Sequence, residues 1–292
     1  MSVRGSVCSQ SATHGTGKGL DAGSIPVRSG RQYVCQDIAG GVVVLSAVLG
    51  IVLAMVLAPW LSRALDARAG FVLALAPLAA FVWLVLQMPS IAAGGQLFES
   101  LPWVPGLGIA LNFRLDGLSL LFALLISGIG TLIVLYAAAY LSDHHHLGRF
   151  YAYLLGFMAS MLGLVLADDL VAMFVFWELT SVCSYLLITF QHERDEARRS
   201  GLQALLITGG GGLALLAGLL LLGLAGEAWQ FSALSAQAAV AHPASSVIVA
   251  LILLGCFTKS AQVPFHLWLP NAMVAPTPVS AYLHSEIGRA HV

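Results

Sequence analysis

The sequence predicts an all-α fold, a polytopic membrane helix bundle of seven transmembrane helices plus the start of an eighth, with helix 7 broken. Hydrophobic residues make up 59% of the 292 residues and charged residues only 9%, and the mean hydropathy is +0.88. A soluble domain carries about 25% charged residues because its surface faces water. The apolar segments also lack the period-2 alternation of a membrane barrel. Helices are then the only structures that can span lipid, because lipid offers no partners to backbone polar groups.

The predicted spans follow from segment length. A helix needs about 20 apolar residues to cross a hydrocarbon core about 30 Å thick. The segments that reach or approach this length are 41–61, 70–88, 117–141, 151–167, 169–190, 202–225 and 245–270, and an eighth begins near Thr277. The sixth segment contains four consecutive glycines at 209–212. In a membrane helix such glycines favour close packing against a neighbouring helix.

The two ends of the chain do not resemble the middle. Residues 1–40 are polar and rich in Gly and Ser, without helical periodicity. This pattern favours a disordered extension or a wrongly assigned start. The net charge of −1 provides no basic footprint for nucleic acid. The four cysteines have no paired spacing and no cofactor motif is visible, so neither a cofactor nor a metal site is predicted.

Loop charge predicts the orientation. The connections after the first, third and fifth spans hold Arg63, Arg68, Arg149, Arg194, Arg198 and Arg199, whereas those on the other side hold only Arg114. The positive-inside rule therefore places the first set in the cytoplasm and the start of helix 1 outside. The extension opposes this prediction, because it carries Arg4, Lys18, Arg28 and Arg31 on the outer side.

Two ionisable residues lie inside apolar segments, where a charge is costly and therefore informative. Glu178 follows Asp169 by nine residues, which is about 13 Å along a helix and close to the bilayer midplane. Lys259 lies deep in the seventh segment, and Pro264 should break or kink that helix just after it. Together they suggest a buried proton path. The alternative is a structural glutamate that bonds to a neighbouring helix, with inert polar groups in a membrane scaffold.

Two histidines extend this candidate path. His284 falls about two turns into the eighth segment, and histidine titrates closest to physiological pH, which suits a relay step. A neutral histidine that bridges two helices is the alternative. His266 lies just past the predicted break and is the secondary candidate. The predicted relay is thus Glu178, Lys259 and His284, with His266 in reserve.

Three motifs carry a resemblance to a known family. They are Trp-Glu-Leu-Thr-Ser at 177–181, Lys-Ser-Ala-Gln-Val-Pro-Phe-His-Leu-Trp-Leu-Pro-Asn-Ala-Met at 259–273 and Ala-Pro-Thr-Pro-Val-Ser-Ala-Tyr-Leu-His at 275–284. These resemble the antiporter-type subunits shared by respiratory complex I and Mrp cation/proton antiporters. Within that family, the Leu-Thr-Ser after Glu178 and the position of Asn271 are similar to the A-type subunit of the multisubunit Na⁺(K⁺)/H⁺ antiporter.

The resemblance implies a function and a setting. It implies that Glu178, Lys259 and His284 are the proton-channel residues of helices 5, 7 and 8, in a membrane subunit that exchanges Na⁺ or K⁺ for protons. It also implies partner antiporter subunits, a bacterial inner membrane and a transporter subunit rather than an enzyme. The alternative within the family is a proton-pumping subunit of NADH-quinone oxidoreductase.

The chain departs from the family pattern in two further places. Val274 stands where a glutamate is usual. Residues 286–292 replace the expected small-residue continuation of helix 8, which indicates a non-native tail. Residues 41–285 would then be the N-terminal part of the antiporter-like domain in a truncated chain.

Overall fold

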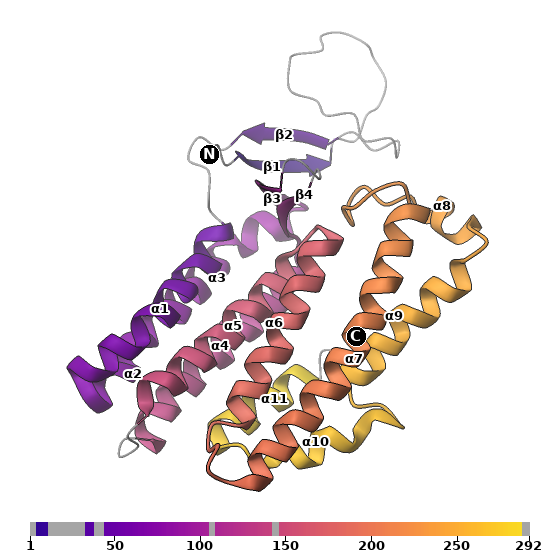
Figure 1. The fold of residues 1–292 in the computed structure, drawn as a ribbon. Helices are drawn as coiled ribbons and strands as arrows, with labels where there is room; N and C mark the ends of the chain where they lie inside the picture. Colours follow the sequence, from indigo (N-terminus) through magenta and orange to yellow (C-terminus); the bar gives the residue numbers. More distant parts are fainter. Residues whose placement is uncertain (1–3, 11–32, 38–43, 105–108, 142–145, 288–292) are drawn as a thin grey trace.

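The computed structural model describes residues 4–10, 33–37, 44–104, 109–141 and 146–287. Within them, long helices form a bundle with a small antiparallel sheet at one end (Figure 1). Six spans among these residues are long and apolar enough to cross a membrane, which confirms the predicted polytopic helical membrane fold. They are α1 (Val44–Leu65), α2 with α3 (Ala69–Leu73 and Leu75–Ala92, together one span), α4 (Gly117–Tyr140), α5 (Leu147–Leu166), α6 (Leu170–Ile188) and α7 (Asp195–Ala225).

The predicted seventh span is interrupted. Helix α9 (Ser245–Lys259) has only 15 residues and ends at the lysine. Three short elements follow, namely η3 (Phe265–Leu267), α10 (Trp268–Asn271) and η4 (Ala272–Val274). The predicted break in helix 7, just after Lys259, is therefore confirmed. The predicted eighth segment starts as α11 (Thr277–Ile287), and α8 (Ala236–Ala241) is a short helix before α9.

A four-stranded sheet, which the sequence did not predict, lies at one end of the bundle. Its strands are β1 (Arg4–Gln10), β2 (Tyr33–Asp37), β3 (Gln96–Val104) and β4 (Ile109–Leu115), in the antiparallel order β2-β1-β3-β4. β1 and β2 fall within residues 1–40, the segment for which the sequence favoured a disordered extension. The remainder of that extension lies outside the described residues, as do residues 288–292 of the expected non-native tail. Gly5 on β1 pairs with Glu99 on β3. Local sequence patterns do not reveal a pairing between segments so far apart in the chain.

Helix α5 occupies the centre of the first half of the bundle. It packs against α1, α4 and α6, and 72% of its most apolar 18-residue stretch is buried. Helices α6, α7 and α9 then follow side by side (Figure 1). Helix α11 returns to pack against α4 and α6, where Tyr282 donates to Ile126 O at 3.1 Å. This return brings the last described helix back to the helix that carries Glu178.

The connection between α5 and α6 is buried at the sheet end. Asp169 accepts hydrogen bonds from the amides of Val171 and Ala172 and so caps α6. Asp168 accepts from the amide and the hydroxyl of Ser232, at 3.1 and 2.5 Å. The two aspartates are only 4% and 3% exposed. Their hydrogen bonds replace water and fix the start of α6.

Candidate functional site

Glu178 lies in the middle of α6, on the side that meets α7. Helix α6 packs between α5 and α7. The glutamate side chain is half-buried, and its Oε1 is buried without a hydrogen-bond partner among the described residues. A buried carboxylate oxygen without a partner is costly. Such a group is a candidate for chemistry rather than for structural stabilisation.

Lys259 is brought to Glu178 from the end of α9. The lysine is only 7% exposed, and its Nζ donates to Thr180 Oγ1 at 2.6 Å and to Ser181 Oγ at 3.0 Å. Its ammonium also lies 5.5 Å from the centre of the Trp177 ring. Thr180 and Ser181 follow Glu178 within one turn of α6, so the ammonium lies against the stretch of helix that carries the glutamate. The structure thus brings together two of the three predicted relay residues.

The hydroxyls of Thr180 and Ser181 are functional candidates that sequence reasoning missed. Each accepts from Lys259, and each also donates to Trp177 O, at 2.7 and 3.5 Å. Because their protons point to that carbonyl, their lone pairs are available to the ammonium. The available signal was the placement of two hydroxyls two and three residues after a buried glutamate. These uncharged groups can hold a protonated lysine whether or not the carboxylate is close.

The end of α9 also favours a positive charge. The last carbonyls of a helix lack intrahelical partners and carry a partial negative charge. Lys259 is the last residue of α9, so its ammonium belongs at such an end. Trp268, from beyond the break, donates its Nε1–H to Thr258 O at 2.9 Å. The break therefore provides both a polar helix end for the lysine and an anchor that holds this end in place.

Close packing of α7 against α9 sets where Lys259, at the end of α9, lies along α7. Gly255 lies so near α7 that a β-carbon there would be 2.7 Å from the β-carbon of Leu215 and 3.0 Å from Gly211 O. A β-carbon on Gly218 would be 2.8 Å from Ile252. Glycine therefore allows α7 and α9 to approach closely at these two positions, which lie outside the run 209–212 for which the sequence predicted close packing. Helix α9 accordingly ends beside the middle of α7 (Figure 1).

The two histidines differ in placement. His284 lies on α11, which packs against α4 and α6, but its side chain lies outside the described part of the structure. His266 lies on η3, just past the break, and is exposed. Neither histidine is thereby assigned to the Glu178–Lys259 pair, and their roles in the relay stay predictions.

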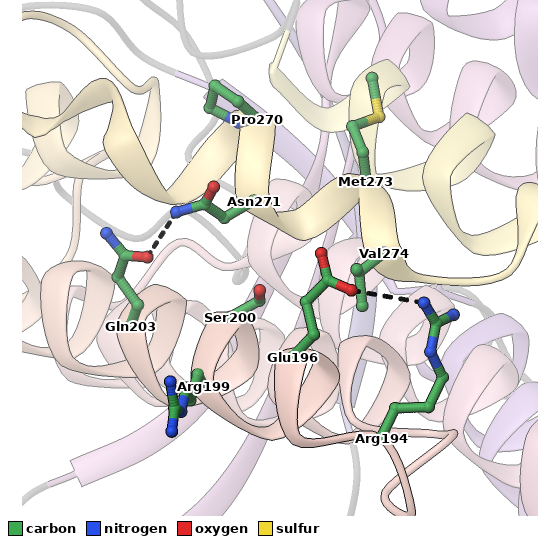
Figure 2. Close-up of a pocket in the computed structure, with 9 residues that line it drawn as sticks. All are labelled: Arg194, Glu196, Arg199, Ser200, Gln203, Pro270, Asn271, Met273 and Val274. Carbon is green, nitrogen blue, oxygen red and sulfur yellow. Dashed lines mark hydrogen bonds and ion pairs between the residues drawn. The ribbon is translucent and has the colours of Figure 1, made fainter.

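A polar pocket of about 660 Å³ opens at the N-terminal end of α7 (Figure 2). It lies between the first turns of α7 and the α10–η4 segment, where Asn271 Nδ2 donates to Gln203 Oε1 at 2.7 Å and Arg194 pairs with Glu196 at 3.3 Å. Val274 lines this pocket and contributes no charge to it. The full lining is Arg194, Glu196, Arg199, Ser200, Gln203, Pro270, Asn271, Met273 and Val274.

Two family models match this chain. One is described as "NADH:quinone oxidoreductase/Mrp antiporter, TM" and matches residues 167–289. This match includes Glu178, Lys259 and the break. The other is described as "NADH-Ubiquinone oxidoreductase (complex I), chain 5 N-terminus" and matches residues 103–151.

Similar proteins carry antiporter names. The Na(+)/H(+) antiporter A1 subunit of Staphylococcus haemolyticus is 48% identical over 211 residues, which cover 72% of this chain and 26% of that protein. A Staphylococcus saprophyticus protein, provisionally named antiporter subunit mnhA2, is 49% identical over 221 residues, covering 74% of this chain and 28% of that protein. A chain in the structure of the Mrp complex from Dietzia sp. DQ12-45-1b matches with a TM-score of 0.77 and 37% identity, covering 83% of this chain and 26% of that chain. This chain therefore spans about a quarter of the length of these relatives.

Proposed function

Because the chain belongs to the family of antiporter subunits shared by NADH:quinone oxidoreductase and Mrp antiporters, we propose that it forms the N-terminal part of the A-type subunit in a multisubunit Na⁺ or K⁺/H⁺ antiporter. It would work as a transporter subunit rather than as an enzyme, with other antiporter subunits as partners. The named relatives favour this function over proton pumping in NADH-quinone oxidoreductase. In that setting the membrane is a bacterial inner membrane, and residues 41–285 are the start of the antiporter-like domain.

The observation that carries the proposal is the buried Lys259 ammonium at the end of a broken helix. It is held by Thr180 and Ser181, which follow Glu178 within one turn of α6. A nearby carboxylate favours the protonated lysine, and withdrawal of the carboxylate favours proton release. The hydroxyls offer the ammonium neutral acceptors during that exchange. A proton can then pass from Glu178 to Lys259 and onward to His284, with His266 as a secondary carrier.

The test is cation-dependent proton movement in inverted membrane vesicles that contain the assembled antiporter complex. Glu178→Gln and Lys259→Met each remove one proton carrier at nearly constant volume, so we expect each to lower the transport rate at least tenfold. Arg198→Gln is the matched control, because it removes an exposed charge that pairs with Asp195 at the start of α7. Full transport by both the Glu178→Gln and the Lys259→Met variants would overturn the relay and leave the buried charges a structural role.

A further inference from the structure

Four consecutive glycines on α7 face different surroundings, although their sequence is uniform. A β-carbon built on Gly210 has no atom within 4 Å, and one on Gly209 would be 3.9 Å from Glu178 Oε2, an ordinary contact. On Gly211 the added β-carbon would overlap the Thr258 hydroxyl. On Gly212 it would overlap Glu178 Oε1 and be 2.9 Å from Glu178 Cδ. Of these four positions, Gly212 is the one that leaves a space filled by the candidate proton carrier itself.

The occupant of this space is the reacting end of the side chain. Oε1 of Glu178 is buried and has no hydrogen-bond partner among the described residues, so no hydrogen bond within them fixes this oxygen in place. The wall of α7 defines its position instead. Because Gly212 has no side chain, the carboxylate can lie directly against the α7 backbone. Any β-carbon at this position would force the carboxylate elsewhere.

We propose that Gly212 is a positioning residue for the Glu178 carboxylate, and that its missing side chain sets the place from which Glu178 exchanges protons with Lys259. This inference rests on the proposed function of Glu178. The overlapping atoms belong to the far end of a flexible side chain, so an added methyl group displaces the carboxylate more readily than it separates the helices. Alanine is also the better helix former, so Gly212→Ala does not weaken α7 itself. The effect therefore falls on transport, where a displacement of about 1 Å can cost on the order of 100-fold.

The experiment compares variants in the assembled antiporter complex, with complex abundance and cation-dependent proton movement measured for each. Gly212→Ala should lower the transport rate at least tenfold at unchanged abundance. Gly210→Ala is the matched control on the same helix and should stay within twofold of the parent, because its β-carbon meets open space. Equal transport by the Gly212→Ala and Gly210→Ala variants would overturn the proposal.

Shortening the carboxylate side chain should make transport insensitive to Gly212→Ala, an effect that a merely structural role of Gly212 would not produce. Glu178→Asp draws the carboxylate back by one carbon, which frees the space beside position 212. On its own this change should lower transport, but adding Gly212→Ala to it should cost less than a further twofold. Such non-additivity is the signature of two residues in contact. A second tenfold loss in the double variant would mean that the two positions act independently, and would also overturn the proposal.

Two further variants separate the possible failures. If Gly212→Ala prevents assembly, combining it with Glu178→Ala should restore complex abundance to that of Glu178→Ala alone, because the overlapping carboxylate is gone. Abundance that stays low in this double variant would show that the obstacle is not Glu178, which overturns the positioning role. Full transport by Glu178→Gln would instead remove the proposed proton role of Glu178 itself. The Glu178→Gln variant thus tests the proton role of Glu178, whereas the comparison of Gly212→Ala with Gly210→Ala tests the positioning role of Gly212.

Discussion

At the scale of single residues, Lys259 is stabilised by neutral groups as well as by a charge. Two hydroxyls accept hydrogen bonds from its ammonium, and an indole ring lies 5.5 Å away. Hydrogen bonds to a charged group contribute about 1.5–3 kcal/mol each. With Glu178 as its only partner, the ammonium would be strongly destabilised whenever the carboxylate moved away. Thr180 and Ser181 reduce that cost, which suits the proposed role of Lys259 as a group that gains and loses a proton repeatedly.

Asp168, in the α5–α6 connection, provides a prediction on pH. Burial raises the pKa of its carboxyl above the ordinary value of 3.8, against the opposing effects of Ser232 and the Arg114 guanidinium 3.9 Å away. The folded chain then binds more protons than the unfolded chain, so this group's contribution to stability is present below pH 3.8 and is lost as pH rises through the folded pKa. Asp168→Asn carries no charge at any pH. We expect its thermal midpoint, relative to the parent, to increase as pH rises through that window.

The control for this prediction is Asp66→Asn. Asp66 is exposed and has a φ of 46°, a conformation that asparagine also tolerates. Thermal unfolding in detergent at a series of pH values checks both variants. A difference between the Asp168→Asn variant and the parent that stays constant or shrinks as pH rises would contradict the prediction.

Sequence reasoning singled out the charged residues of the candidate site but not the roles of the uncharged ones, for a physical reason. A Glu or Lys inside an apolar segment is costly, so Glu178 and Lys259 stand out against their surroundings. Thr180, Ser181 and Gly212 are of types common in membrane helices and carry no such cost. Their importance depends on which residue of another helix faces them. Only the packing of α6 against α7 and α9 supplies that information.

At the scale of elements, the long helices were predictable and the sheet was not. Hydropathy alone locates a helix, because its backbone hydrogen bonds are all local. A strand needs a partner, and β1 pairs with β3, which follows only after α1, α2 and α3 in the chain. The end of α9 lies between these cases. Pro264 predicted a break just after Lys259, and α9 does end at Lys259, but the hydrogen bond from Trp268 to Thr258 across the break could not be predicted from hydropathy.

Helix α1 depends on the sheet for its cap, which leads to a prediction for Glu99. This β3 residue is 5% exposed, and its carboxylate accepts hydrogen bonds from the amides of Val44 and Leu45 at 2.6 and 2.7 Å. Glu99→Ala leaves both amides unpaired and removes a negative charge from the helix N-terminus. Each unpaired buried amide costs about 1–3 kcal/mol. We expect a lower thermal midpoint and faster hydrogen exchange at residues 44 and 45.

The matched control for Glu99 lies next to it on the same strand. Ser100 is exposed, so Ser100→Ala should change the thermal midpoint little and leave hydrogen exchange at the start of α1 unaltered. If the Glu99→Ala variant unfolds at the same temperature as the Ser100→Ala variant, and residues 44 and 45 stay equally protected, the carboxylate is not the cap that holds α1.

At the scale of the whole molecule, charge and architecture divide the bundle into two ends. The sheet lies at one end, whereas the turns α1–α2 and α6–α7 lie at the other (Figure 1). The second end carries the arginines that predict a cytoplasmic location, and the polar pocket beside α10 is also there (Figure 2). Lys259 lies between the ends, beside the middle of α7. In the proposed relay, a proton would therefore reach the Glu178–Lys259 pair from within the bundle rather than at either surface.

The orientation of these ends is the last prediction. The positive-inside rule places the arginine-bearing end in the cytoplasm and the sheet outside. In a variant without its four native cysteines, one cysteine is introduced either as Glu193→Cys, exposed in the α6–α7 turn, or as Ala233→Cys, exposed between α7 and α8. A membrane-impermeant maleimide should label the Ala233→Cys variant in intact cells and the Glu193→Cys variant only in inverted vesicles. Detergent-solubilised samples, in which both sites react, control for intrinsic reactivity. The reverse labelling pattern would mean that the bundle has the opposite orientation in the membrane. It would place the pocket outside the cell and the sheet in the cytoplasm, so that protons approach Lys259 from the opposite side.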